Sequence, residues 1–187
     1  ILASYRPLDQ TADTLLDRAH RDRAPYNIWR DQGRLTETPG TQIDHQLIRA
    51  VLKENREKFD IERIGFDPWH ADTLIDQLVN EDGFSVEQVL AVPQTYAGMS
   101  IACLKLQAEI LAANVDARGC PVTAWAVSNT VDQRDGKDNM MFVKKKSRGR
   151  IDPVIAPTIG MALALRMRVV PRSVYLDRGV LDLADFL

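Results

Sequence analysis

The sequence has few residues that could build a disulfide framework or a zinc site. Its 187 residues include two cysteines and three histidines. Cys103 and Cys120 have no zinc-ligand spacing with each other or with the histidines, and no secretory segment precedes them. We therefore expect both cysteines to be reduced core thiols, and we expect no zinc centre.

Long apolar runs and the common phosphate-binding loops are also absent. The apolar run VIAPTIGMALAL near the C-terminus contains a proline and has about half the length that a membrane-spanning helix needs. The chain has no G-x-x-x-x-G-K-[ST] loop, no G-x-G-x-x-G turn and no G-x-S-x-G elbow. These absences argue against a membrane span, nucleotide binding and serine-hydrolase chemistry. A small-molecule α/β enzyme would need a closed apolar pocket, which the sequence does not indicate.

The composition is that of an ordinary globular domain. Hydrophobic residues make up 45% and charged residues 27% of the chain, and the net charge is -2. A chain of this length fits one domain with its own core. It begins at Ile1, inside an apolar run and without a methionine, which suggests a fragment of a longer polypeptide.

Helix-like and strand-like segments alternate along the chain. Apolar spacing predicts helices over 11–19, 43–59, 69–79, 99–113 and 121–131, a short helix before Gly33, and a long last helix from Asp152. Strand-like or extended segments are predicted at 1–6, 34–40, 61–66, 85–93 and from 140 onward. Ser100 or Gly98 is expected to cap the helix over 99–113. The alternation favours an α/β domain with a mostly parallel or mixed sheet.

The stretch IERIGFDPWH places an acid, Asp67, at the end of a predicted buried strand. Ligands of open α/β sheets gather beyond the carboxyl ends of the strands, and Pro68 fits a strand-to-helix corner there. Asp67 is therefore a candidate site residue, although an Asp-Pro pair is also a common helix start. His70 lies three residues after Asp67, on the predicted first turn of the helix that follows, and could contact the metal ligands without binding the metal itself. A surface or packing role is the alternative for His70.

A second Asp-Pro pair, at Asp152, opens the last helix directly behind a basic cluster, so helix capping is again an alternative. Five cations lie within seven residues: Lys144, Lys145, Lys146, Arg148 and Arg150. Such a cluster is often only a solvated face, but it is also typical of sites that neutralise phosphates. An acid behind these cations fits a place where a polyanion meets a metal ion.

Carboxylates at the edge of a sheet are suitable ligands for Mg²⁺ or Mn²⁺. Two such ions, about 3.5 to 4 Å apart, would activate water and stabilise the leaving oxygen of a phosphodiester. Asp67 and Asp152 are the predicted metal ligands and catalytic residues. The basic cluster is predicted to contact the phosphates of double-stranded DNA.

Four motifs follow one another between about residues 5 and 180. They are YNIWRDQGRLTETPGTQID, IERIGFDPWHADTL, QTYAGMS at 94–100, and Arg-Ile-Asp with a following alanine at 150–156. In this order they resemble the nuclease domain of the tailed-phage terminase large subunit, the DNA-packaging motor protein. Each motif is short, and the order of the four makes the resemblance fairly specific.

The resemblance implies an RNase H-like fold, in which helices flank a mixed sheet, and a single nuclease domain over residues 1–187. It implies that acids around two divalent metals cut concatemeric DNA, with Asp67 at the end of the central strand and Asp152 near the start of the C-terminal helix. Residues 137–150 would lie against the DNA backbone. The family's first acid stands on the first strand, which we expect to be missing here. The family's ATPase domain is expected upstream of Ile1.

We therefore predict a metal-dependent endonuclease domain that cuts DNA without strong sequence specificity. By resemblance, its partners would be the terminase small subunit and the portal protein in the host cytoplasm, with no membrane. The alternative is a non-catalytic RNase H-like module that binds DNA or docks to the motor. In that alternative both acids serve only as helix caps.

Overall fold

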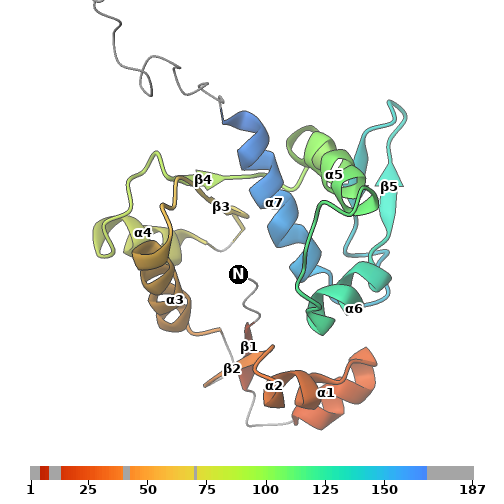
Figure 1. The fold of residues 1–187 in the computed structure, drawn as a ribbon, viewed down its shortest axis with the longest axis horizontal. Helices are drawn as coiled ribbons and strands as arrows, with labels where there is room; N and C mark the ends of the chain where they lie inside the picture. The colour runs from red at the N-terminus through yellow and green to blue at the C-terminus, as the bar shows by residue number, and fades with distance from the viewer. Residues whose placement is uncertain (1–4, 9–13, 40–42, 70, 168–187) are drawn as a thin grey trace, which may run out of the picture.

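The computed structural model describes residues 5–8, 14–39, 43–69 and 71–167, in which helices and strands alternate (Figure 1). The helices are α1 (Leu15–Asp22), α2 (Tyr26–Asp31), α3 (His45–Lys58), α4 (Asp72–Asn80), α5 (Tyr96–Leu111), α6 (Pro121–Asn129) and α7 (Asp152–Arg166). The strands are β1 (Tyr5–Leu8), β2 (Thr36–Pro39), β3 (Ile64–Phe66), β4 (Val89–Ala91), β5 (Asp132–Arg134) and β6 (Met140–Phe142). The predicted alternation is confirmed, with boundaries that differ by a few residues.

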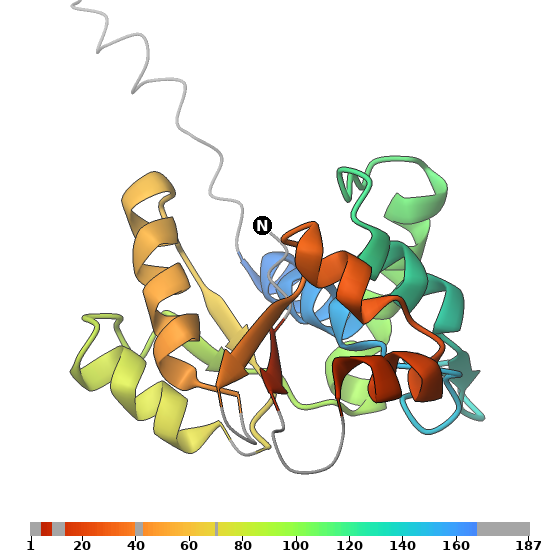
Figure 2. The same cartoon turned by 90° about the horizontal axis from the view of Figure 1, so that it is seen from below.

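The described strands form three two-stranded sheets instead of one. β1 pairs with β2 and β3 with β4, both in parallel, whereas β5 and β6 form an antiparallel pair. The α/β class is confirmed, whereas the continuous mixed sheet that the sequence predicts is present among the described residues only as separate strand pairs. The physical reason is visible in Figures 1 and 2: α7 lies between the β3–β4 pair and the α5 and β5–β6 side of the molecule. A helix in this position keeps the two pairs from joining in one hydrogen-bonded ladder.

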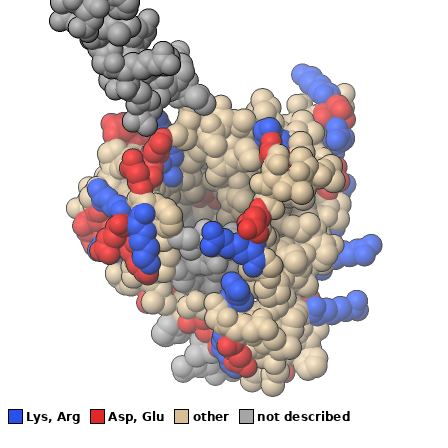
Figure 3. Space-filling view, in the orientation of Figure 1, with Lys and Arg blue, Asp and Glu red and all other residues tan. Residues whose placement is uncertain are grey.

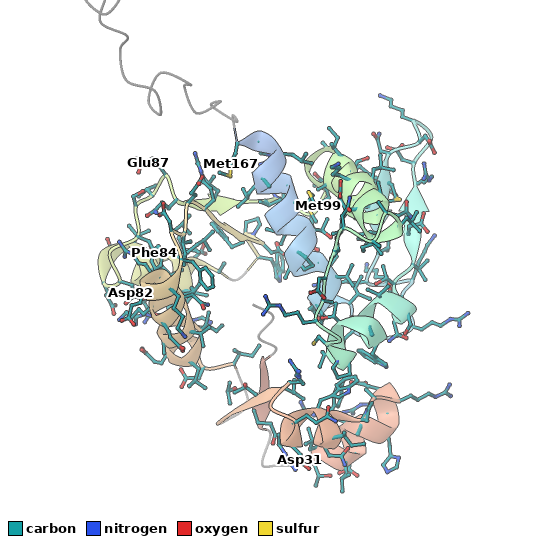
Figure 4. All side chains as sticks on the ribbon, viewed as in Figure 1. Asp31, Asp82, Phe84, Glu87, Met99 and Met167 are labelled. Carbon is teal, nitrogen blue, oxygen red and sulfur yellow. The ribbon has the colours of Figure 1, made fainter. Side chains whose placement is uncertain are left out.

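Helix α7 is the central packing element. It contacts α5, α6 and β3, and its buried residues join Met99 of α5 in the largest buried cluster of the described residues (Figure 4). Gly65 of β3 has no room for a Cβ, which would overlap Ile159 and lie 2.9 Å from Leu163 Cδ1. The strand that precedes Asp67 therefore lies directly on the helix that begins at Asp152.

A tight corner leads from β4 into α5. Thr95, and neither Ser100 nor Gly98, is the N-cap of α5, because its side chain accepts a hydrogen bond from the Gly98 N–H at 3.1 Å. Ser100 is buried and accepts from the Met140 N–H at 3.0 Å, which ties α5 to β6. A Cβ at Gly98 would overlap the Pro93 carbonyl oxygen, so the corner requires glycine there.

A smaller core joins α3, α4 and the β3–β4 pair, and it contains a buried ion pair. Arg49 of α3 is 6% exposed and donates to both carboxylate oxygens of Asp82, at 2.6 Å and 2.7 Å. The Asp82 side chain is fully buried and also contacts Lys53 Nζ at 2.8 Å. Phe84 packs nearby, and Figure 4 labels Asp82 and Phe84 beside α3 and α4. The pair fixes the end of α4 against α3.

Both cysteines are free and buried, as the sequence predicts for core thiols. Cys103 lies in the cluster around α7, where burial raises the pKa of its thiol, and Cys120 lies at the start of α6. Within the described residues, no helix combines the length and the apolar character that crossing a membrane requires.

Candidate active site

The parallel pairing of β3 and β4 brings Asp67 next to Gln94. Phe66 is paired with Ala91, and the Val92 N–H donates to the Phe66 carbonyl at 2.8 Å, so both strands end at the same edge. Beyond that edge, Gln94 Nε2 donates a hydrogen bond to Asp67 Oδ2. Asp67 Oδ1 accepts from the Trp69 N–H at 3.2 Å. Each carboxylate oxygen of Asp67 therefore has one donor and keeps a further lone pair.

Asp67 is not the cap of the helix that follows it. Helix α4 begins five residues later, at Asp72, and its N-cap is Ala71, which makes no side-chain cap bond. The Asp67 carboxylate instead closes a short turn with Trp69 and is half-buried at the strand end. The capping interpretation of Asp67 is wrong, because Pro68 and the turn separate the acid from the first helical N–H groups.

Asp152 is the first residue of α7, and Ile151 holds the cap position without a side-chain cap bond. The prediction that Asp152 itself caps the helix is therefore also wrong. Lys144 Nζ lies 2.7 Å from Asp152 Oδ1 and draws the carboxylate toward the loop before the helix. The Asp152 side chain is 63% exposed, so this surface pair stabilises the fold little and leaves the acid accessible.

The basic loop, defined as residues 144–150, connects β6 to α7 and is anchored through its backbone and its small residues. The Ser147 hydroxyl donates to the Val143 carbonyl at 2.8 Å and accepts from the Val131 N–H at 3.2 Å. A Cβ at Gly149 would lie 2.9 Å from Trp125 Cζ2, so the loop packs closely on α6. The five cations of the loop are all exposed: Lys144, Lys145, Lys146, Arg148 and Arg150.

Direct contact between predicted site residues is limited to Lys144 and Asp152 in the part of the chain that the structure describes. His70 lies outside the described residues. Charges on the face in Figure 3 are mixed, with Lys and Arg interspersed among Asp and Glu over the α3 side, and they form no single basic band among the described residues there. The basic loop differs from this mixed surface because it has five cations within seven residues, next to the acid Asp152.

The two predicted ligands suit a hard divalent cation. Each is a carboxylate with open lone pairs: Asp67 follows β3, Asp152 begins α7, and β3 contacts α7 further along the helix, at Ile159 and Leu163. Among the described residues, no group of three or more His, Cys, Asp or Glu could hold a metal ion. Mg²⁺ commonly keeps several waters and binds one or two carboxylates plus substrate phosphates. The chemistry of Asp67 and of Asp152 suits such an ion, each as a single carboxylate ligand, and no direct contact joins the two acids among the described residues.

Gln94 is the residue that sequence reasoning missed at this edge. It lies 27 positions after Asp67, and no local pattern links an amide to an acid at that distance. The sequence did contain a signal that could have found it, because Gln94 lies three residues after the predicted parallel strand β4, and the carboxyl ends of parallel strands share one edge.

An acid at a strand end, a second acid at a helix start and a basic loop that leads from a strand into that helix are together the pattern expected of a candidate nuclease domain of the α/β class. A model of the family described as the terminase large subunit, endonuclease domain, matches residues 1–167. The chain belongs to this family, and the resemblance noted from the four motifs is confirmed.

Two relatives and one solved structure match large parts of the chain. The terminase large subunit of Enterobacteria phage HK97 is 31% identical over 151 residues, which cover 81% of this chain and 30% of that protein. Protein YmfN of Escherichia coli K12 is 25% identical over 161 residues, covering 85% of this chain and 34% of its own length. The crystal structure of the HK97 bacteriophage large terminase matches with a TM-score of 0.74 at 29% identity, covering 85% of this chain and 32% of that one. This chain thus spans about a third of the length of its relatives.

Proposed function

We propose that residues 1–187 form a single RNase H-like nuclease domain that hydrolyses phosphodiester bonds of double-stranded DNA with two Mg²⁺ or Mn²⁺ ions. The main support is Asp67, a half-buried acid at a strand end whose two oxygens are each oriented by one N–H donor. Asp67 does not cap α4, so helix capping does not account for an acid at this place. The family assignment over 1–167 agrees with nuclease chemistry.

In this function Asp67 and Asp152 would hold the metal ions, which would supply activated water and stabilise the leaving oxygen. Asp67 enters the reaction already oriented, because donors from Trp69 and Gln94 act on its carboxylate. Asp152 is accessible from solvent, and Lys144 beside it offers a positive charge to an approaching phosphate. The chain's own contribution is therefore a fixed acid directly after β3 and an open acid at the start of α7.

The basic loop would bind the DNA backbone. Its cations project from a backbone that Ser147 and Gly149 hold against the end of α6. Phosphate contacts of this kind position a duplex without reading its sequence. This agrees with cutting of concatemeric DNA without strong sequence preference. By resemblance to the family, the terminase small subunit and the portal protein in the host cytoplasm would be its partners.

Removing divalent metal should abolish cutting. With EDTA present, the protein should leave supercoiled plasmid intact, and added Mn²⁺ or Mg²⁺ should restore nicked and linear products, because the carboxylates alone cannot activate water. Gel electrophoresis of a plasmid time course measures this. Undiminished cutting in EDTA would contradict the metal mechanism. An absence of both cutting and calorimetric Mn²⁺ binding would favour the non-catalytic DNA-binding module.

Replacing Lys145, Lys146 and Arg148 together with glutamine should weaken DNA binding without changing sequence preference. Each cation that neutralises a phosphate contributes about 0.9 to the slope of log K against log salt. We expect this slope to fall by about 2 to 3 for the triple variant. Fluorescence anisotropy of a labelled duplex at several salt concentrations gives the slope.

A matched control removes three exposed cations from other elements: Lys58, Lys105 and Arg166. The net charge changes by the same amount in both triple variants, so general electrostatic attraction is held constant. Equal losses of slope in the two variants would argue against the basic loop as the DNA-contacting surface.

A further inference from the structure

Gln94 lies on the corner between β4 and α5, and this corner is held in one shape. The Thr95 N–H donates to the Pro93 carbonyl at 2.8 Å, and the Met99 N–H donates to the Thr95 carbonyl at 2.9 Å. The cap bond from Gly98 to Thr95, and the lack of space at Gly98, close the turn further. The half-buried Gln94 side chain therefore extends from a fixed base toward Asp67.

The donors on Asp67 come from two different elements. The Trp69 N–H belongs to the turn that follows β3, whereas the Gln94 amide reaches over from the end of β4. The turn alone restrains Oδ1 and leaves the carboxylate free to rotate about that contact. The amide of Gln94 restrains Oδ2, so the plane of the carboxylate and the directions of its open lone pairs are set by both contacts.

We propose that Gln94 is a positioning residue, which orients the Asp67 carboxylate for a divalent cation. This inference rests on the proposed function. Hydrogen-bond partners of metal ligands commonly change metal affinity or activity by about 10- to 100-fold when they are removed. Gln94 does not touch the metal in this role. It acts through Asp67, and its amide donor is suited to an ionised carboxylate, which is the form that binds a cation.

The test compares Gln94→Met with the wild type by calorimetric titration of the metal-free protein with Mn²⁺ alone. Methionine keeps the length and volume of glutamine and removes the donor. We expect Mn²⁺ affinity to fall about tenfold or more, with a thermal unfolding midpoint close to that of the wild type. Gln107→Met, at an exposed position of α5, is the matched control and should leave the affinity unchanged.

A second comparison separates positioning from a general effect on the fold. In the Asp67→Asn background, Gln94→Met should change Mn²⁺ affinity no further, because the carboxylate that it orients is gone. A loss of the same size in both backgrounds would overturn the inference. So would unchanged affinity in Gln94→Met when the wild type binds Mn²⁺. The wild-type titration distinguishes the two failures. If the wild type binds no Mn²⁺, the proposed function fails and the inference fails with it; if the wild type binds Mn²⁺ and Gln94→Met binds it equally well, only the inference fails.

Discussion

Replacing Asp67 with asparagine should lower the rate of Mn²⁺-dependent plasmid nicking by about 100-fold or more. Metal-ion catalysis of phosphodiester hydrolysis is worth several kcal/mol, and each 1.4 kcal/mol is about a factor of ten in rate. Asparagine has the shape of aspartate but lacks its negative charge, so it can accept the Trp69 bond without holding a divalent cation. Initial rates of supercoil loss at saturating Mn²⁺ measure the effect.

Asp72→Asn is the matched control for this variant. Asp72 is an exposed acid at the first position of α4, five residues after Asp67, and the substitution removes the same charge from the same region. It should cut at the wild-type rate. Thermal unfolding of both variants checks that the fold is retained. An Asp67→Asn protein that is folded and still cuts at the wild-type rate would remove Asp67 from the catalytic site.

Helices were predictable because their cause is local. The apolar spacing of α3 and α4 and the glycine after α2 depend on neighbouring residues only, and each predicted helix is present within a few residues of its expected bounds. The caps were less predictable, since several polar residues competed at each start. Thr95 caps α5 because the helix begins at Tyr96, three residues before its predicted start, so that Ser100 lies inside the helix and accepts from the Met140 N–H.

The arrangement of the strands depends on contacts that local patterns do not contain. The alternation of helices and strands predicted a single sheet, whereas α7 packs between the strand pairs. Gly65 permits that packing, because a side chain there would overlap Ile159, which lies 94 positions later in the sequence (159 minus 65). Nothing in the strand itself indicates which helix will cover the glycine.

Local sequence patterns indicated some residues of the candidate site, and contacts between distant parts of the chain determined the others. Asp67 and Asp152 were identified from their places at a strand end and a helix start, and the structure gives each a partner that capping would not have given: Gln94 for Asp67 and Lys144 for Asp152. The Lys144 contact spans eight positions and follows a visible basic cluster. The Gln94 contact joins the ends of two strands, so predicting it would have required knowledge of the register in which β3 and β4 pair.

The buried ion pair of Arg49 and Asp82 gives the second large expected effect. Asp82→Ala should lower the free energy of unfolding by about 3 to 5 kcal/mol, because removing one partner of a buried pair leaves the other charge uncompensated. Arg49 would keep only the exposed Glu81 at 2.7 Å and the weaker contact with Gln46 at 3.4 Å. Chemical denaturation at neutral pH measures the change. Asp76→Ala, at an exposed position of α4, should change the free energy of unfolding by less than about 0.5 kcal/mol.

The same pair predicts how stability depends on pH. Hydrogen bonds from Arg49, aided by Lys53, hold the pKa of Asp82 well below its usual range in the folded protein. A depressed carboxyl pKa adds stability above the ordinary aspartate value, and that stability is lost as the pH falls toward the folded-state value. The difference between the wild type and Asp82→Ala should therefore be constant above about pH 5 and shrink below it. A difference that stays constant to strongly acid pH would show that the cavity, and not the charge, causes the loss.

Replacing both partners by apolar residues separates the cost of an unpaired charge from the worth of the pair. In Arg49→Met with Asp82→Leu, no buried charge is left without a partner, and similar replacements elsewhere are often neutral or stabilising. We expect the double variant to regain most of the stability that Asp82→Ala loses. If it is as unstable as the single variant, the pair itself holds α4 against α3. In either case plasmid nicking at a temperature where both variants are folded should be unchanged, because the pair contacts neither Asp67 nor Asp152.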